Sequence, residues 1–237
     1  MDMQQIAQLK SLLAQAKFAV FFGGAGMSTE SGIPDFRGSA GLYSDVDNEY
    51  AMSRQCLKAE PERFFQFFRT KMLYPDAQPN AAHRALAQLE QDGIIRGVIT
   101  QNIDELHQKA GSRNVIEIHG TAISSYCQRC GKLYRSAHLA DEEVPRCEVC
   151  GGVVRPDVVL YGEALDSRRF SAAQALIAQA DLLIVGGTSL TVYPAASLVA
   201  DFEGKHLVII NKGPTGLDSK ADLIIRESVS AVFSRLI

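Results

Sequence analysis

The residues from Gly24 to Arg37 follow directly on an apolar run and combine glycines with acidic, aromatic and basic side chains. An apolar run that ends in glycines indicates a buried strand that stops abruptly. Backbone N–H groups can approach an anion closely there, and the positive end of a following helix adds to the attraction. Proteins commonly hold a dinucleotide pyrophosphate in this way. The match to G-x-G-x-x-G is incomplete, because Gly24 and Gly26 fit while Thr29 takes the third glycine position. The mixed segment 33–37 is too specific in its chemistry for an ordinary connecting loop, so we expect a ligand site here.

Four cysteines form two C-x-x-C pairs, Cys127 with Cys130 and Cys147 with Cys150, separated by sixteen residues. Two such pairs at this distance can supply four thiolates to one tetrahedral zinc ion. Because four thiolates fill the coordination shell and leave no position for water, the zinc is predicted to be structural. A redox dithiol pair and an iron–sulfur cluster are the competing interpretations. Cys56 is left over, and we expect an unreactive buried thiol there.

Polar side chains also follow two other apolar runs. Gln101, Asn102 and Asp104 come after the run at 98–99, and their short polar groups can hydrogen-bond sugar hydroxyls or an amide, although a helix cap by Asn102 or Asp104 is an equally ordinary role. His119 follows the run at 115–118, where its ring should project beyond the sheet edge and could take a proton near neutral pH. For the other four histidines we favour a structural role.

The composition is that of an ordinary globular protein. The chain has 237 residues, of which 46% are hydrophobic and 22% charged, with a formal net charge of -3. This charge creates no global attraction to nucleic acid or anionic membranes, and the basic residues near the cysteines are balanced by acidic ones, so we expect no direct nucleic acid binding. The start of the chain lacks the features of a signal peptide, and no apolar run approaches the roughly 18 residues of a membrane span. We therefore expect no membrane association and a cytoplasmic location.

Strand and helix patterns alternate along the chain. Strands are expected at 18–22, 98–99, 115–118, 182–185, 207–210 and 223–225, and helices at 3–16, from residue 61, at 80–92, 168–180, 194–202 and at the end of the sequence. Continuous apolar strands separated by helices predict an α/β fold, a Rossmann-like parallel sheet with helices on both faces. The aperiodic segment from 39 to about 60 predicts a long functional loop.

Ligands of such folds bind beyond the carboxyl ends of the strands. The polar motifs at 24–37, 100–104, 119, 187–189 and 211 all lie at those ends. This coincidence argues for one shared site more strongly than any single motif does. The cysteine-bearing segment 122–154 has few large aliphatic residues and is expected to have little core of its own.

In chain order, these motifs resemble those of the sirtuin family, the NAD-dependent protein-lysine deacylases. The resemblance covers nearly the whole chain. The short ends and compact size of the chain are similar to those of the bacterial members. The resemblance rests on 24–37, Thr100-Gln-Asn-Ile-Asp104, His119-Gly120, the four cysteines, Arg155-Pro-Asp-Val-Val-Leu-Tyr-Gly-Glu163, Gly187-Thr-Ser-Leu190 with Pro194-Ala195, and Asn211. Several long motifs in the right order make an accidental match very improbable.

The resemblance implies an enzyme that consumes NAD to remove acetyl or other neutral acyl groups from lysine side chains of proteins, yielding nicotinamide and 2'-O-acyl-ADP-ribose. It implies His119 as general base on a ribose hydroxyl and Asn102 as the other catalytic residue. Contacts to NAD are implied for Gly24, Ala25, Gly26, Ser28, Thr29, Asp35, Phe36, Arg37, Gln101, Asn102, Ile103, Asp104, His119, Gly187, Thr188, Ser189, Asn211 and Val229.

The same resemblance implies a domain organisation. Residues 1–38, 91–122 and 155–237 would form the NAD-binding Rossmann-like domain. A small domain would combine a cofactor loop and helical insertion at 39–90 with a zinc-ribbon module at 123–154, which holds one structural zinc ion.

An acylated protein or peptide substrate would lie along the extended segment 158–163 and pair with it as an added strand. The residues implied are Val158, Val159, Tyr161, Gly162 and Glu163. Without the resemblance, the stretch 158–160 could be merely an interior strand.

The acyl group is the sharper question. Family members that prefer succinyl or malonyl groups carry Tyr-x-x-Arg on the helix before Pro79-Asn80, where this chain has Phe65 and Phe68. Phenylalanine cannot compensate a buried carboxylate, so we expect acetyl-lysine or another neutral acyl group. The neighbouring Phe64 and Phe67 could simply be core.

Three other functions were weighed. Mono-ADP-ribosyl transfer would use the same NAD site, but a base for the ribose hydroxyl suits deacylation better. A non-catalytic zinc-ribbon or NAD-binding module predicts a missing base or altered residues at 102 and 104, and none is missing. A dehydrogenase normally has an acidic residue about 20 positions beyond the glycines, at the end of a second strand. Here Asp45 and Asp47 lie in an apparent loop with no strand before them.

Overall fold

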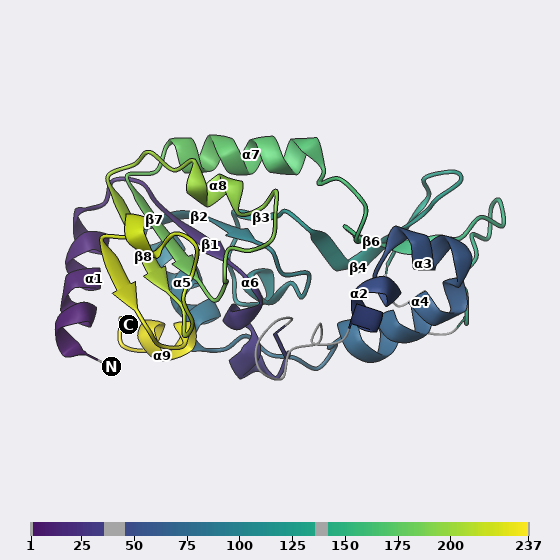
Figure 1. Ribbon diagram of the computed structural model, residues 1–237, viewed down its shortest axis with the longest axis horizontal. Coiled ribbons are helices and arrows are strands. Elements are labelled where there is room, and N and C mark those ends of the chain that lie inside the picture. The colour runs from purple at the N-terminus through teal and green to yellow at the C-terminus, as the bar shows by residue number, and fades with distance from the viewer. Residues whose placement is uncertain (1, 36–45, 136–141, 237) are drawn as a thin grey trace.

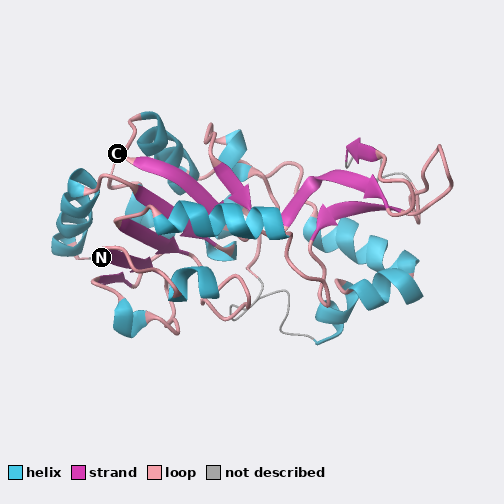
Figure 2. Cartoon of the chain, turned by 90° about the horizontal axis from the view of Figure 1, so that it is seen from above, coloured by secondary structure: helices cyan, strands magenta, loops and turns pink. Residues whose placement is uncertain are grey.

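The computed structural model describes residues 2–35, 46–135 and 142–236. The chain forms two lobes that lie side by side along its longest axis (Figure 1). The larger lobe holds both ends of the chain, and the smaller lobe is built from segments inserted between its strands. Figure 2 shows the same two lobes from above, with strands in each. Among the described residues, no helix combines the length and the apolar character that a membrane crossing needs.

The larger lobe is built on a six-stranded parallel sheet. Its strands are β1 (Ala19–Gly23), β2 (Ile95–Thr100), β3 (Val115–Glu117), β7 (Leu182–Gly186), β8 (His206–Ile210) and β9 (Leu223–Ile225). They lie in the order β3-β2-β1-β7-β8-β9, and every neighbouring pair is parallel. The strand order reverses between β1 and β7, which is the switch point where ligands of this type of sheet bind. The predicted α/β fold is confirmed.

Each face of the sheet carries its own core, because side chains alternate along a strand. Phe21 packs into one cluster with α1 (Met3–Gln15), α5 (Ala81–Gln91) and α9 (Val229–Phe233). Phe22 packs into the other with α7 (Ser167–Ala178) and α8 (Ser197–Ala200). Both phenylalanine side chains are completely buried. This two-sided burial explains why the strands are continuous apolar runs.

Local signals fix the start and end of α5 as predicted. The Asn80 side chain accepts from the N–H groups of Ala82 and His83, and the His83 ring accepts in return from the Asn80 N–H. This reciprocal arrangement is a capping box. Gly93 follows the helix with φ of 74°, a conformation that favours glycine after a helix end. A further short helix, α6 (Leu106–Lys109), follows β2.

The smaller lobe joins an antiparallel sheet to a helical insertion. The sheet contains β4 (Gly120–Cys127), β5 (Leu133–Arg135) and β6 (Val154–Val158) in the order β5-β4-β6. The helices are α2 (Val46–Ala51), α3 (Arg54–Ala59) and α4 (Pro61–Phe67), and α4 continues into a π-helical turn at Phe68–Met72. The two parts share one core, in which buried Cys127 and Cys147 pack with Phe64, Phe65 and Phe68. The cysteine segment thus packs against the helices, in agreement with the prediction that it has little core of its own.

The prediction of one long loop from 39 to 60 is wrong for its described part. Residues 46–51 and 54–59 form α2 and α3, which are six residues long each. Helices this short do not complete two turns, so they show no periodic apolar pattern. The Ser53 side chain caps α3 by accepting from the Cys56 N–H, and Met52, Cys56 and Leu57 are buried against the rest of the lobe.

Candidate active site

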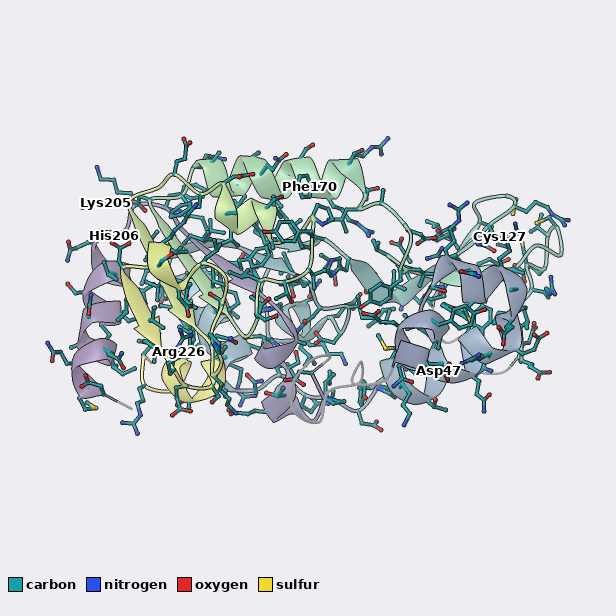
Figure 3. All side chains as sticks on the ribbon, viewed as in Figure 1. Asp47, Cys127, Phe170, Lys205, His206 and Arg226 are labelled. Atoms are coloured by element: carbon teal, nitrogen blue, oxygen red, sulfur yellow. The ribbon has the colours of Figure 1, made fainter. Side chains whose placement is uncertain are left out.

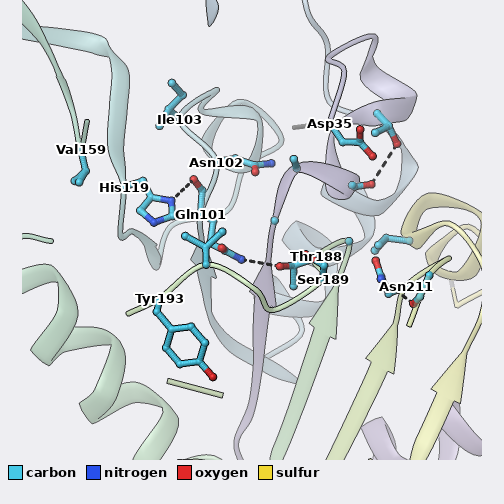
Figure 4. Close-up of a pocket in the computed structure, with 18 of the residues that line it drawn as sticks. Asp35, Gln101, Asn102, Ile103, His119, Val159, Thr188, Ser189, Tyr193 and Asn211 are labelled. Atoms are coloured by element: carbon cyan, nitrogen blue, oxygen red, sulfur yellow. Dashed lines mark hydrogen bonds between the residues drawn. The ribbon is translucent and has the colours of Figure 1, made fainter. Parts of the chain in front are cut away.

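A cavity of about 720 Å³ opens at the carboxyl ends of the parallel strands and extends to the smaller lobe (Figure 4). Most of the residues predicted to contact a ligand line it. From that set they are Gly24, Ala25, Gly26, Thr29, Asp35, Gln101, Asn102, Ile103, His119, Val158, Val159, Tyr161, Gly162, Glu163, Gly187, Thr188, Ser189, Asn211 and Val229. Residues far apart in the sequence are thus brought to one place by the strand order. The predicted contacts Phe36 and Arg37 lie outside the described residues.

Two glycine turns meet at the switch point of the sheet. Gly24 follows β1 and Gly187 follows β7, and the Gly26 N–H donates to the Gly187 carbonyl at 2.8 Å. A Cβ atom on Gly26 would lie 2.8 Å from the Gly187 Cα, and Gly187 itself has φ of 63°. Only glycine permits this approach of two backbones without strain.

The expected helix start after Gly24 is wrong. The chain instead forms two 3-10 turns, Ala25–Met27 and Thr29–Ser31. The N–H groups of Gly24, Gly26, Met27 and Ser28 are paired with backbone carbonyls. Among the described residues, the Ala25 N–H is the one in 24–28 that has no partner, so it is the group here that can meet an anion without breaking an internal bond.

His119 lies in the turn between β3 and β4. Its Nδ1 atom is 2.9 Å from the carbonyl oxygen of Gln101. A carbonyl can only accept, so Nδ1 carries the proton and Nε2 is left as the basic nitrogen. Burial lowers the pKa of His119, against the opposing effect of the hydrogen bond to Gln101. The ring is therefore neutral at pH 7 and able to take a proton.

Gln101 connects this histidine to the glycine turns. Its side-chain amide donates to the Thr188 hydroxyl at 3.1 Å, and its backbone N–H donates to the Gly23 carbonyl (Figure 4). The side chain therefore spans from β2 to the turn after β7, across the switch point. This contact fixes the spacing between His119 and the two glycine turns.

A second cavity of about 470 Å³ adjoins the first and shares Ala25, Met72, Asn102 and Ile103 with it. The predicted contacts Ser28 and Asp104 line this second cavity. Asn102 donates to the Ser28 hydroxyl at 3.0 Å, and Ser28 donates to an Asp104 carboxylate oxygen at 2.6 Å. Burial raises the pKa of the Asp104 carboxyl, although its hydrogen bonds oppose this. The result is a small polar wall in an otherwise largely apolar pocket.

The segment 158–163 leaves β6 and forms part of the cavity wall. The Val159 N–H donates to the His119 carbonyl at 2.9 Å, and the backbone of Tyr161 pairs with the chain at 52–54. Among the described residues, the Val159 carbonyl and the Gly162 N–H have no partner. An extended ligand could pair with these two groups.

Several residues that line the cavity were missed by the sequence reasoning. Met52 and Met72 come from the helical insertion, and Tyr193, which is 72% exposed, comes from the turn before α8. No motif marks either methionine, since both lie in segments that read as a loop or as an aromatic helix. Tyr193 could have been found, because it directly precedes the Pro194-Ala195 pair that belongs to the same motif.

The four cysteines come together in the smaller lobe, and none of them lines the large cavity. Figure 3 shows Cys127 in that lobe, at the opposite end of the molecule from His206. The four sulfur atoms lie within 4.8 Å of one another, with Cys127–Cys150 at 3.4 Å and Cys130–Cys147 at 3.6 Å. Zn–S bonds of about 2.3 Å in a tetrahedron place sulfurs about 3.8 Å apart, so the cluster fits such an ion.

Hydrogen bonds from neighbouring groups favour a thiolate at Cys147, whereas the other thiols of the cluster raise the pKa of Cys150. The Tyr134 hydroxyl donates to the Cys147 sulfur at 3.1 Å, and this bond lowers the pKa of Cys147 to about 6. The Arg129 N–H points to the Cys127 sulfur at 3.4 Å. A Cβ on Gly152 would lie 2.9 Å from the Cys127 sulfur, so glycine is needed for this tight turn. A divalent metal that prefers sulfur is the ligand that these groups can hold.

Comparison with known proteins gives a consistent result. The Sir2 family matches residues 24–194. An NAD-dependent protein deacetylase of Cutibacterium acnes is 52% identical over 233 residues, which cover 96% of this chain and 95% of that protein. A solved structure of Sir2 with a p53 peptide and NAD⁺ has a TM-score of 0.89 and 40% identity, covering 100% of this chain and 97% of the other. A structure of a Sir2 protein bound to a propionylated peptide has a TM-score of 0.89 and 39% identity, covering 98% and 96%.

Proposed function

The chain belongs to the Sir2 family, the sirtuins, and on that premise we propose that it is an NAD-dependent protein-lysine deacetylase. It removes acetyl or other neutral acyl groups from lysine and yields nicotinamide and 2'-O-acyl-ADP-ribose. The observation that supports this most strongly is the position of His119. Its free Nε2 belongs to a ring held by the Gln101 carbonyl, in the wall of a cavity at the switch point of the sheet.

NAD fits the described residues as a co-substrate. The cavity of about 720 Å³ lies at the switch point, and the Ala25 N–H there has no partner within the described part of the chain. We propose that the glycine turn holds the pyrophosphate and that Gly187, Ser189, Asn211 and Val229 contact the adenosine half. When bound, NAD supplies the ribosyl carbon that exchanges nicotinamide for the acyl oxygen of the substrate lysine.

In this proposal, His119 accepts a proton from a ribose hydroxyl. Its Nδ1–H stays bonded to Gln101, so Nε2 receives the proton and the ring becomes a cation only during turnover. Burial opposes that charge, which is why the proton is easily passed on afterwards. The same ring position suits deacylation better than mono-ADP-ribosyl transfer, which needs no base for that hydroxyl.

The second cavity is the proposed nicotinamide pocket. Ser28, Asn102 and Asp104 form a hydrogen-bonded row at its inner end, while Ile33 and Ile103 supply apolar walls. The Asp104 carboxylate already accepts from Ser28 and from the Leu106 N–H. We therefore propose that it orients Asn102 through Ser28, while the carboxamide of nicotinamide bonds to Asp35 or to backbone near Asp104.

The acylated peptide is proposed to lie along 158–163. The free Val159 carbonyl can accept from the substrate, and the free Gly162 N–H can donate to it. Backbone pairing carries little sequence information, so broad peptide tolerance is expected.

We propose that the acyl group removed from the substrate lysine is neutral. Met52 and Met72 line the cavity, whereas Phe65 and Phe68 are completely buried in the core of the smaller lobe. Neither methionine can pair with a carboxylate, and burying an unpaired carboxylate is costly. Comparing acetylated and succinylated versions of one peptide tests this: faster turnover of the succinyl form would contradict it.

We further propose one structural zinc ion at Cys127, Cys130, Cys147 and Cys150, with no role in the chemical step because four thiolates leave no open position. The Rossmann-like domain would comprise 1–38, 91–122 and 155–237, and the small domain 39–90 and 123–154. A cytoplasmic location suits cysteines arranged for a metal and not for disulfides.

The function is tested by nicotinamide release from NAD, with and without an acetylated peptide. Release only with acetylated peptide supports deacetylation. Release with unmodified protein would instead indicate ADP-ribosyl transfer, and no release under either condition would indicate a binding role.

A further inference from the structure

A largely buried ion pair joins Arg155 of β6 to Glu163, at the end of the proposed substrate segment. The Arg155 side chain is 3% exposed, and the Glu163 side chain is 22% exposed. Two nitrogen atoms of the guanidinium contact the two carboxylate oxygens, at 2.5 and 3.1 Å. The guanidinium also lies over the ring of Tyr126, 5.6 Å from its centroid. Partial burial alone would raise the pKa of the Glu163 carboxyl, but the hydrogen bonds from Arg155 and from the Leu160 N–H lower it below its ordinary value.

Arg155 Nε donates to the Pro156 carbonyl at 3.3 Å, and two further hydrogen bonds of this pair go to the backbone of the substrate segment. The Arg155 guanidinium donates to the Val158 carbonyl at 2.5 Å, and the Glu163 carboxylate accepts from the Leu160 N–H at 3.0 Å. These two bonds lie on either side of Val159. They turn the Val158 carbonyl and the Leu160 N–H toward the ion pair and away from any substrate.

Val159, held between those two bonds, joins the segment to the proposed base. Its N–H donates to the His119 carbonyl at 2.9 Å, while its own carbonyl has no partner among the described residues. The ion pair therefore fixes both the position of the Val159 carbonyl and its distance from His119.

Stability alone does not account for this arrangement. Desolvation of two charges offsets most of their attraction, so a buried ion pair contributes little net stability compared with apolar side chains of similar size. The remaining role for the ion pair is to hold the backbone around it in one conformation. We propose that Arg155 and Glu163 are positioning residues that hold the segment 158–162 in the shape that receives the acyl-lysine peptide. This rests on the proposed function.

The experiment measures steady-state deacetylation of an acetyl-lysine peptide together with NAD binding and thermal unfolding. Glu163→Gln keeps the shape and one acceptor oxygen but removes the charge. The double variant Arg155→Met with Glu163→Leu removes both charges, so no unpaired ion is left buried and the fold is expected to persist. Arg155→Lys keeps the positive charge. Arg63→Met, which breaks the exposed pairs of Arg63 with Asp47 and Glu60 in the same lobe, is the matched control.

We expect the peptide KM to rise about tenfold in Glu163→Gln and in the double variant, because misplacing a positioned group by about 1 Å can cost up to about 100-fold. The dissociation constant for NAD without peptide should stay unchanged in both. Arg155→Lys should have a peptide KM close to that of the wild type. Arg63→Met should have the wild-type peptide KM.

A double variant that folds and keeps the wild-type peptide KM would overturn the positioning role. A double variant that fails to fold would overturn it as well, since the pair would then serve the fold itself. Equal losses of NAD and peptide binding would also contradict it. Failure of the proposed function is distinguishable, because the wild-type protein would then show no NAD-dependent deacetylation at all.

Discussion

Replacing Gly187 with alanine should damage both the fold and the NAD site. Gly187 has φ of 63°, which is a left-handed conformation, and it lies at the closest approach of the two glycine turns. A Cβ atom built there would lie 2.5 Å from the Met27 nitrogen and 2.6 Å from the Gly26 carbonyl carbon. Both are backbone atoms, so no side-chain rotation can relieve the contact.

The size of the effect follows from two contributions. A non-glycine residue in the left-handed region costs roughly 1–2 kcal/mol. Separating the two turns also breaks or stretches the 2.8 Å bond between the Gly26 N–H and the Gly187 carbonyl, a loss of about 1 kcal/mol. We therefore expect the free energy of unfolding to fall by about 2–3 kcal/mol. The displaced turn should weaken NAD binding by about tenfold or more, which corresponds to about 1.4 kcal/mol.

Urea unfolding and calorimetric titration with NAD measure the two effects. Gly216→Ala is the matched control: Gly216 does not line this cavity, and a Cβ there meets no heavy atom within 4 Å. It should change stability by no more than about 0.5 kcal/mol and leave NAD affinity intact. Wild-type stability and NAD affinity in Gly187→Ala would refute the reasoning.

Three further predictions concern His83, the cysteine cluster and His119. Burial, with a smaller effect from Arg84, lowers the pKa of His83 to about 4, so between pH 6.5 and 4 the unfolded chain binds more protons and stability falls as pH falls. The loss from pH 8 to pH 5 is about 2 kcal/mol for this residue. His83→Gln should reduce that loss in urea unfolding while keeping an acceptor for the Asn80 N–H, and an unchanged pH dependence would contradict the assignment. Removal of metal by a chelator should unfold the smaller lobe and abolish activity, and added zinc should restore the folded lobe and the activity. Full activity and an unchanged melting temperature after chelation would argue against a structural ion. Burial lowers the pKa of His119 against its hydrogen bond, so kcat/KM should be flat from pH 7 to 8 and fall at acidic pH; a profile that still rises between pH 7 and 8 would show that another group is the base.

The sequence predicted those parts of the fold whose signals are local. Continuous apolar runs located the buried parallel strands, and the helix predicted at 80–92 agrees with α5, whose ends carry the Asn80 cap and Gly93. Each of these depends on residues within one helix or one strand. The switch-point site could also be predicted, because parallel strands necessarily bring the residues after them to one edge of the sheet.

Features that depend on tertiary packing could not be predicted. The helices α2 and α3 are too short for a periodic pattern and are stabilised by burial of Met52 and Leu57 against another part of the lobe. Met72 carries no motif and reaches the cavity only because α4 continues as a π-helical turn. The bond between Ala25–Met27 and the turn after β7 replaces the expected helix start, and it joins residues about 160 positions apart.

Mass spectrometry of the products from NAD and one acetyl-lysine peptide tests the central claim most directly. We predict equal amounts of free-lysine peptide, nicotinamide and an ADP-ribose that carries the acetyl group, formed by the wild-type chain and not by a folded His119→Ala variant. Free acetate with unmodified NAD, or the same products at the wild-type rate from the variant, would contradict it.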